Sequence, residues 1–241
     1  MKFLVMKYRL LISLLAFGLF SCSEEDQNAP SQSTLDPFAT GLLVCCLGRA
    51  TKICGTMLEA DKTYEATLQF GEETDSGDLT GNITTQAAEG FSGVTREALL
   101  EVLPEFRGLI EQIPPMYSAL KRDGKPLYEY ARQGIELERP PRQVTIYELE
   151  LLDFDGMQAR LLVDCSKGTY IRTLAQDIGR RLGCGAHLTA LRRTRVGPFH
   201  IENSVELEAL QAMDNPQQTL LPLDALPAGL MPVASLQKDQ L

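Results

Sequence analysis

The sequence has few of the residues that hold structural zinc. Only two histidines occur in 241 residues, and none of the six cysteines forms a Cys-x-x-Cys pair. Structural zinc sites use such closely spaced ligands, so we expect no metal site. Cys45, Cys46 and Cys165 stand in apolar runs, which predicts small buried side chains and suits a reducing compartment.

Glycine-rich loops of the dinucleotide and P-loop types are also absent. Basic residues are fewer than acidic ones, and the formal net charge is -9. This balance does not favour a nucleic-acid partner, because phosphate contacts need Lys and Arg. Between residues 118 and 195, however, there are fourteen Lys and Arg against ten Asp and Glu. Either a basic stripe on an acidic body or an ordinary solvated surface explains this distribution.

The apolar run near the N-terminus is too short to span a bilayer comfortably. Basic residues precede this run, which covers residues 10–20, and a small residue stands before Cys22. The pattern resembles a bacterial lipoprotein signal, in which Cys22 would become lipidated. A buried or frayed helix is the structural alternative. We therefore expect a signal-like segment over residues 1–22 and a polar linker over residues 23–33.

The remaining sequence predicts an α+β fold, because strand and helix patterns are mixed without a regular β-α-β alternation. Residues 61–71 alternate as a half-buried strand does. The pair Asp155-Gly156 separates two β-rich runs and predicts a hairpin. Residues 74–93 predict a long loop. Helices are expected after Thr95, after Pro126, over residues 169–182 and from Ser204 to Ala212.

The first candidate for chemistry is Asp36, in the segment Leu-Asp-Pro-Phe-Ala-Thr-Gly. Pro37 disfavours helical geometry at Asp36, and Gly41 permits close backbone approach. A carboxylate on a loop of small residues, anchored by the apolar run 42–47, is suited to act as a nucleophile or base. An Asx-turn or a helix cap is the ordinary alternative for an Asp-Pro pair.

A second candidate segment, residues 165–172, runs from the end of a strand into the start of a helix. Tyr170 and Arg172 stand at that helix start. An arginine there can pair with a carboxylate such as Asp36 and hold it ionised. A capped helix start with a surface arginine is the alternative.

Two further segments are rich in basic residues. Residues 112–131 interleave aromatic and basic side chains on an irregular segment, as surfaces that stack bases and bind phosphates do. Residues 187–195 contain three arginines within four positions, which suggests phosphate contact. A proline-rich surface loop and a solvated face are the respective alternatives. The RNA-binding candidates are Tyr117, Lys121, Lys125, Arg192 and Arg193.

In their order along the chain, these motifs resemble the TruB-type tRNA pseudouridine synthases, which modify uridine 55 in the T-loop. The resemblance covers about residues 34–232. It is carried by Leu-Asp-Pro-Phe-Ala-Thr-Gly, Asp-Lys-Thr-Tyr, Ile-Pro-Pro-Met-Tyr-Ser-Ala-Leu-Lys, Lys-Gly-Thr-Tyr-Ile-Arg, and Gly-Ala-His through Leu-Arg-Arg. It implies a mixed sheet flanked by helices with an RNA-binding cleft, tRNA as partner, and no cofactor or metal.

The resemblance also implies roles for single residues. Asp36 matches the catalytic aspartate, which either captures C1′ of the ribose or removes its 2′ proton. Tyr64 matches the tyrosine that packs on the flipped base. Tyr170 and Arg172 match the pair that lines the uridine pocket, and Leu191 matches the apolar residue that closes it.

Two parts of the family pattern are missing from the sequence. Ser31 stands where the family has a histidine, and we expect neither the family's first strand nor its C-terminal RNA-binding domain. Residues 34–232 then form an N-terminally truncated catalytic domain, followed by a tail over residues 233–241. The alternatives are a catalytically impaired tRNA-binding protein and a membrane-anchored lipoprotein. We expect a cytoplasmic monomer that reaches a membrane only if Cys22 is lipidated.

Overall fold

A computed structural model describes residues 2–8 and 36–222 of the chain. The predictions for Cys22, for the polar linker with Ser31 and for the C-terminal tail lie outside these residues. None of the helices in the described part is long and apolar enough to cross a membrane.

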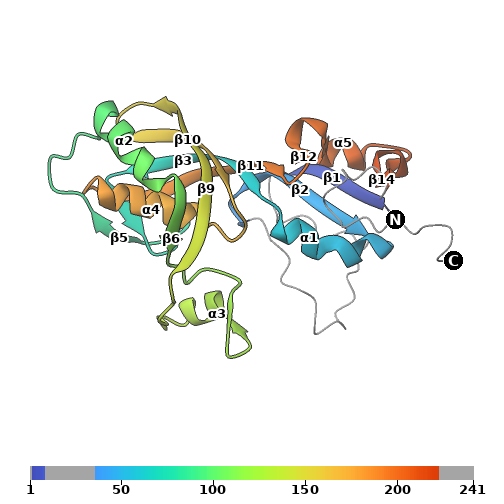
Figure 1. The fold of residues 1–241 in the computed structure, drawn as a ribbon, viewed down its shortest axis with the longest axis horizontal. Coiled ribbons are helices and arrows are strands. Elements are labelled where there is room, and N and C mark those ends of the chain that lie inside the picture. The colour runs from blue at the N-terminus through green and yellow to red at the C-terminus, as the bar shows by residue number, and fades with distance from the viewer. Residues whose placement is uncertain (1, 9–35, 223–241) are drawn as a thin grey trace, which may run out of the picture.

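A mixed sheet forms the body of the described molecule (Figure 1). Its strands are β1 (Lys2–Tyr8), β2 (Thr40–Leu47), β3 (Lys62–Phe70), β6 (Gly108–Gln112), β9 (Arg142–Phe154), β10 (Gln158–Cys165), β11 (Ala186–Val196), β12 (Phe199–His200), β13 (Val205–Glu206) and β14 (Leu221–Pro222). Their order is β13-β1-β2-β11-β3-β10-β9-β6, with β12 paired to β11 and β14 paired to β1. The pairs β2–β11 and β1–β13 are parallel, whereas the other pairs are antiparallel.

Short helices and two small hairpins surround this sheet, which confirms the predicted α+β class. The α-helices are α1 (Cys54–Glu59), α2 (Arg96–Val102), α3 (Leu127–Ala131), α4 (Ile171–Arg181) and α5 (Leu207–Gln211). The 3-10 helices are η2 (Gly48–Ile53), η3 (Leu103–Phe106), η4 (Ile201–Asn203) and η5 (Pro216–Thr219). The hairpins pair β4 (Glu72–Thr74) with β5 (Ile83–Gln86) and β7 (Lys121–Arg122) with β8 (Lys125–Pro126).

The main core lies between β3, β9, β10 and β11 on one side and α2 and α4 on the other. Strand β3 alternates as predicted, since Ala66, Leu68 and Phe70 are buried while the residues between them are partly exposed. Helix α4 contributes Leu174 and Ile178 to the same cluster. The helix therefore holds its N-terminal end against the sheet, and the active-site candidates lie at that end.

Several local predictions are confirmed. The Thr95 side chain accepts a hydrogen bond from Ala98 N and caps α2. Helix α3 begins directly after Pro126, its N-cap residue. The hairpin of β9 and β10 turns at Asp155-Gly156, where Gly156 has a φ of 95°. These signals are local, so the sequence alone contains the information that fixes them.

Two local predictions are wrong. Ser204 does not cap a helix: its hydroxyl donates to the Ile201 carbonyl and ends η4, and β13 follows before α5 begins. Residues 74–93 are not a plain loop, because they contain β5, which pairs with the preceding strand β4. All four side chains of β5 are exposed, so no apolar alternation marks this strand in the sequence.

The N-terminal segment also differs from expectation. Residues 2–8 were assigned to a signal-like segment outside the domain, yet they form β1, which pairs with β2 from Lys2↔Leu47 to Tyr8↔Gly41. Strand β2 lies between β1, which pairs along its whole length, and β11, which pairs with it at Thr40 and Gly41. Strand β1 therefore supports β2 within the sheet, whereas the sequence predicted that the family's first strand is missing.

Candidate active site

The five residues predicted for the uridine site lie in one pocket of about 1070 Å³. They come from four separate parts of the chain. Asp36 stands before β2, and Tyr64 belongs to β3. Tyr170 and Arg172 stand at the start of α4, and Leu191 belongs to β11. The pocket thus opens where α4 meets the central strands of the sheet.

Asp36 is held in a turn, and its carboxylate pairs with an arginine. The Asp36 carbonyl accepts from Ala39 N at 2.8 Å, which closes the turn that precedes β2. Arg172 Nε donates to Oδ2 at 3.0 Å and Nη2 donates to Oδ1 at 2.9 Å. This bidentate geometry fixes both oxygens of the carboxylate. The predicted pairing of Arg172 with Asp36 is present. The turn is closed by the backbone carbonyl of Asp36 and not, as in an Asx-turn, by its side-chain carboxylate.

Arg172 is buried and its guanidinium joins three segments of the chain. Besides Asp36, it donates to the Ser76 carbonyl at 2.9 Å and to the Tyr117 carbonyl at 2.8 Å. The Asp78 carboxylate lies 3.7 Å from Nη1. Asp78 in turn accepts from the Ser76 hydroxyl and from the backbone of Thr80. The arginine that orients Asp36 is therefore itself held from several sides.

Burial raises the pKa of the Asp36 carboxyl above its ordinary value. The guanidinium of Arg172 acts in the opposite direction, both as a charge and as a hydrogen-bond donor, and Asp78 adds to the increase. The carboxylate is consequently a stronger base than a solvated aspartate, while its position is fixed by the ion pair. These are the properties that a reacting carboxylate needs.

Tyr64 forms another wall of the pocket. Burial raises the pKa of its phenol to about 12, and the positive charge of Arg193 opposes the shift. The phenol is thus neutral near pH 7 and presents an aromatic surface with a single polar end. Leu191 is 5% exposed and adds an apolar surface to the same pocket.

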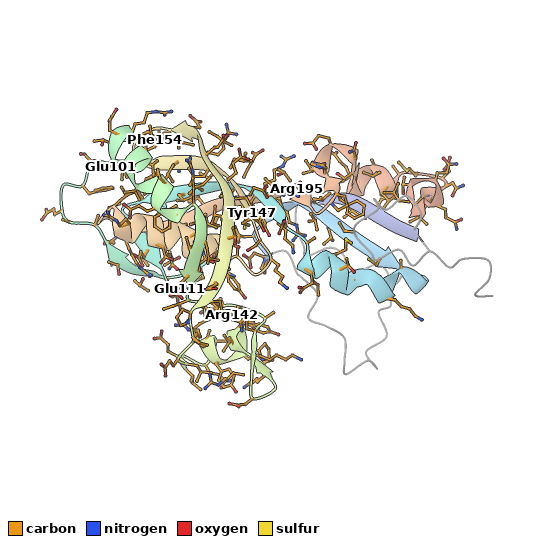
Figure 2. All side chains as sticks on the ribbon, in the orientation of Figure 1. Glu101, Glu111, Arg142, Tyr147, Phe154 and Arg195 are labelled. Atoms are coloured by element: carbon orange, nitrogen blue, oxygen red, sulfur yellow. The ribbon has the colours of Figure 1, made fainter. Side chains whose placement is uncertain are left out.

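Tyr170 is positioned by a glutamine that the sequence did not single out. Gln112 is buried; its Oε1 accepts from Tyr170 N at 3.0 Å and its Nε2 donates to the Tyr170 carbonyl at 3.3 Å. Gln112 ends β6, opposite Arg142, and residues 113–141 between them leave the sheet and carry α3 (Figures 1 and 2). The same contact therefore joins Tyr170 to the base of this insertion.

The predicted RNA-binding residues divide into two groups. Tyr117, Lys121 and Arg193 line the pocket. Lys125 does not line it and lies 3.7 Å from Glu129. Arg192 is exposed and alternates with the buried Leu191 and Arg193, so it points from the opposite face of β11. Arg193 is itself 3% exposed and donates to the Leu42 carbonyl, which places it in the pocket wall rather than on the outer surface.

Cysteine and metal predictions can also be compared with the structure. Cys165 is buried, but Cys45 and Cys46 are partly exposed, so the prediction for these two is wrong. They occupy β2, outside the main core, in a part of the sheet where the described residues form a small apolar cluster around Leu42, Val196 and Ile201. Among the described residues, no group of three His, Cys, Asp or Glu side chains could hold a metal ion.

The family model described as TruB family pseudouridylate synthase, N-terminal domain, matches residues 27–171, which is more than half of the chain. The chain belongs to the TruB family of pseudouridylate synthases. A second model, described as the tRNA pseudouridylate synthase B C-terminal domain, matches residues 172–236. The predicted family is thereby confirmed, and the boundary between the two models falls at Arg172 itself.

Curated relatives and solved structures agree with this membership. The tRNA pseudouridine synthase B of Bordetella pertussis is 74% identical over 199 residues, covering 83% of this chain and 82% of that protein. The protein of the same name from Dechloromonas aromatica is 57% identical, covering 80% of this chain and 64% of that protein. A chain of a Cbf5-Nop10-Gar1 complex is similar with a TM-score of 0.59 and 29% identity, covering 79% of this chain and 50% of that chain.

Gly41 holds the Asp36 turn against the sheet, and its replacement by alanine is expected to destabilise the fold. Its φ is 104°, and a Cβ atom would lie 2.2 Å from the Arg193 carbonyl oxygen of the neighbouring strand. We expect a loss of roughly 2–3 kcal/mol in the free energy of unfolding, measured by urea denaturation. Gly55→Ala is the matched control, because nothing lies within 4 Å of the added Cβ. Equal stability of the two variants would contradict this role of Gly41.

Proposed function

We propose that this protein isomerises uridine to pseudouridine at position 55 of tRNA, with Asp36 as the reacting carboxylate. The observation that carries the proposal is the bidentate pair of Arg172 and Asp36 inside a pocket that Tyr64, Tyr170 and Leu191 also line. Family membership supports the reaction, and the curated relatives carry the name tRNA pseudouridine synthase B.

The chemistry explains why these residue types are needed. The bond between C1′ and N1 breaks, and its electron pair leaves with the uracil. The base then turns and forms a new bond from C5 to C1′, after which C5 loses its proton and N1 gains one. A carboxylate serves this reaction either by capturing C1′ or by removing the 2′ proton, and Asp36 is the group for both routes.

The walls of the pocket retain the base while it is detached. A uridine within a folded RNA must leave its stack before an enzyme can reach C1′, and aromatic side chains stabilise the flipped base. Tyr64 and Tyr170 supply aromatic surfaces on two sides of Asp36, and Leu191 supplies an apolar one. Lys121 and Tyr117 of the insertion stand at the same pocket and are suited to contact the RNA around the flipped nucleotide.

The test uses a strain that lacks its own uridine 55 synthase. Expression of this chain should restore pseudouridine at position 55, detected by mass mapping of the purified tRNA. A tRNA with cytidine at that position should acquire no pseudouridine. Modification at another position would refute the site assignment, and no modification by well-expressed protein would refute the activity.

The same proposal places the protein in the cytoplasm as a monomer. tRNA is an intracellular substrate, and the candidate site residues Asp36, Tyr64, Tyr170, Arg172 and Leu191 line one pocket without a contribution from a second copy. The five cysteines in the described part are free thiols, which suits a reducing compartment. Cell fractionation followed by mass measurement of the native N-terminus tests this location. Recovery from membranes with Cys22 acylated would refute it.

A further inference from the structure

Two cations on the neighbouring strands β3 and β11 are buried in the pocket wall, and no carboxylate of the described residues forms an ion pair with either of them. Lys62 is 6% exposed and Arg193 is 3% exposed, and both line the pocket. Within the part of the chain that the structure describes, no Asp or Glu oxygen lies within 4.0 Å of either side chain. Asp36 shares the pocket, but both of its oxygens are bonded to Arg172. Buried charges are normally paired, so this arrangement calls for an anion.

The hydrogen bonds of Lys62 leave one donor available. Its Nζ donates to the Leu58 carbonyl at 2.6 Å and to the Ala60 carbonyl at 2.5 Å, both at the end of α1. An ammonium group carries three protons. For the third proton the described residues supply no acceptor. Arg193 donates from Nε to the Leu42 carbonyl and its charge acts on the phenol of Tyr64, and the described residues supply no carboxylate for its remaining guanidinium protons.

We propose that Lys62 and Arg193 together bind one phosphate of the RNA backbone next to the flipped uridine. The inference rests on the proposed function, since RNA is the anion that this pocket is built to receive. A phosphate has enough acceptor oxygens to accept a hydrogen bond from each cation at the same time. The pair then fixes the backbone of the flipped nucleotide while Tyr64, two residues after Lys62 on β3, contacts the base.

The electrostatics of Lys62 provide a specific signature of this contact. Burial, followed by the charge of Arg193 on β11, lowers the pKa of Lys62 to about 8. Cys165 on β10 and Asp61 before β3 act in the opposite direction, and the accepting carbonyls belong to Leu58 of α1 and to Ala60, which follows it. A bound phosphate favours the charged form and raises this pKa. Below pH 8 Lys62 is charged, and RNA affinity is therefore highest there. As the pH rises above 8, Lys62 loses its proton and the affinity declines by up to about tenfold per pH unit.

The experiment measures the affinity of unmodified tRNA in the Asp36→Asn background, which stops turnover, between pH 7 and 9 and at several salt concentrations. Lys62→Met should weaken binding, remove the decline above pH 8 and lower the log–log salt slope by about 0.7, the value for one phosphate contact. Lys62→Arg should also remove the pH dependence, because arginine stays charged, but should keep the salt slope. Lys52→Met, at an exposed position of η2, is the control and should change neither.

Each remaining outcome has a defined meaning. A salt slope that Lys62→Met leaves unchanged, with the pH dependence still removed, would indicate contact with a neutral uracil carbonyl and would overturn the phosphate contact. Affinity that is independent of pH in the parent protein would overturn it as well. Pseudouridine formation by the native protein together with either result refutes this inference alone. Absence of pseudouridine with the expected binding pattern refutes only the proposed function, and absence of tRNA binding refutes both.

Discussion

Asp36→Asn is expected to lower the rate of pseudouridine formation by about 10⁴-fold, the scale of loss seen when a single reacting group is removed from an enzyme. The amide has the same shape as the carboxylate and still accepts one hydrogen bond from Arg172. It carries no negative charge, however, and can neither capture C1′ nor remove the 2′ proton. The rate is measured in single turnovers by tritium release from C5 of labelled uridine in tRNA, because C5 loses its proton when the new bond forms.

The control for this variant is Glu89→Gln, which neutralises an exposed carboxylate outside the pocket. Its rate should equal that of the parent protein. Binding of tRNA by Asp36→Asn should persist, which separates loss of chemistry from loss of substrate. A rate within tenfold of the parent would show that another group carries the reaction.

Arg172→Met is expected to reduce both stability and activity. The change leaves the buried Asp78 carboxylate, both oxygens of Asp36 and the carbonyls of Ser76 and Tyr117 without their shared donor. Removing one partner of a buried pair costs about 3–5 kcal/mol; because the Asp36 side chain is 31% exposed and can be hydrated, we expect about 3 kcal/mol. Urea denaturation followed by circular dichroism measures this loss.

The pH dependence of the variant gives a second readout. Arg172 is the main cause that lowers the pKa of Asp36, so without it the raised pKa rises further. Because Asp36 must be ionised to react, activity is lost as the pH falls through this pKa, and the loss should occur at a higher pH in the variant. Arg181→Met, on the exposed face of the same helix, should shift neither the unfolding midpoint nor the pH profile. An unshifted acid limb in Arg172→Met would contradict the role of the ion pair.

Asp36, Tyr170 and Arg172 were candidates because each stands in a local motif whose chemistry is readable, whereas Tyr64 and Leu191 were proposed only from the family resemblance. Pro37 favours extended or turn geometry at Asp36. Arg172 stands where a β-rich run passes into a predicted helix. What the sequence does not contain is the identity of distant partners. Lys62, Asp78 and Gln112 were not singled out, because their roles depend on residues that approach only in the folded chain.

The fold was predictable where patterns are periodic and failed where they are not. The alternation of β3 and the Asp-Gly turn after β9 are local signals. Strand β5 is exposed throughout, so its pairing with β4 rests on backbone hydrogen bonds and on the Thr84 hydroxyl, which donates to the Glu73 carbonyl, rather than on apolar packing. Residues 2–8 precede a long apolar run, and this context favoured a signal-like interpretation over the strand that they form.

The contacts of Arg172 also determine when the site can assemble. They join it to Asp36, Ser76 and Tyr117 across 136, 96 and 55 residues of sequence. Contacts of such separation form late in folding, because the intervening chain must first be closed into loops. During synthesis at roughly 5–20 residues per second, Asp36 is made about 7–27 seconds before the arginine that orients it. A nascent chain therefore carries the proposed reacting carboxylate well before the arginine that pairs with it.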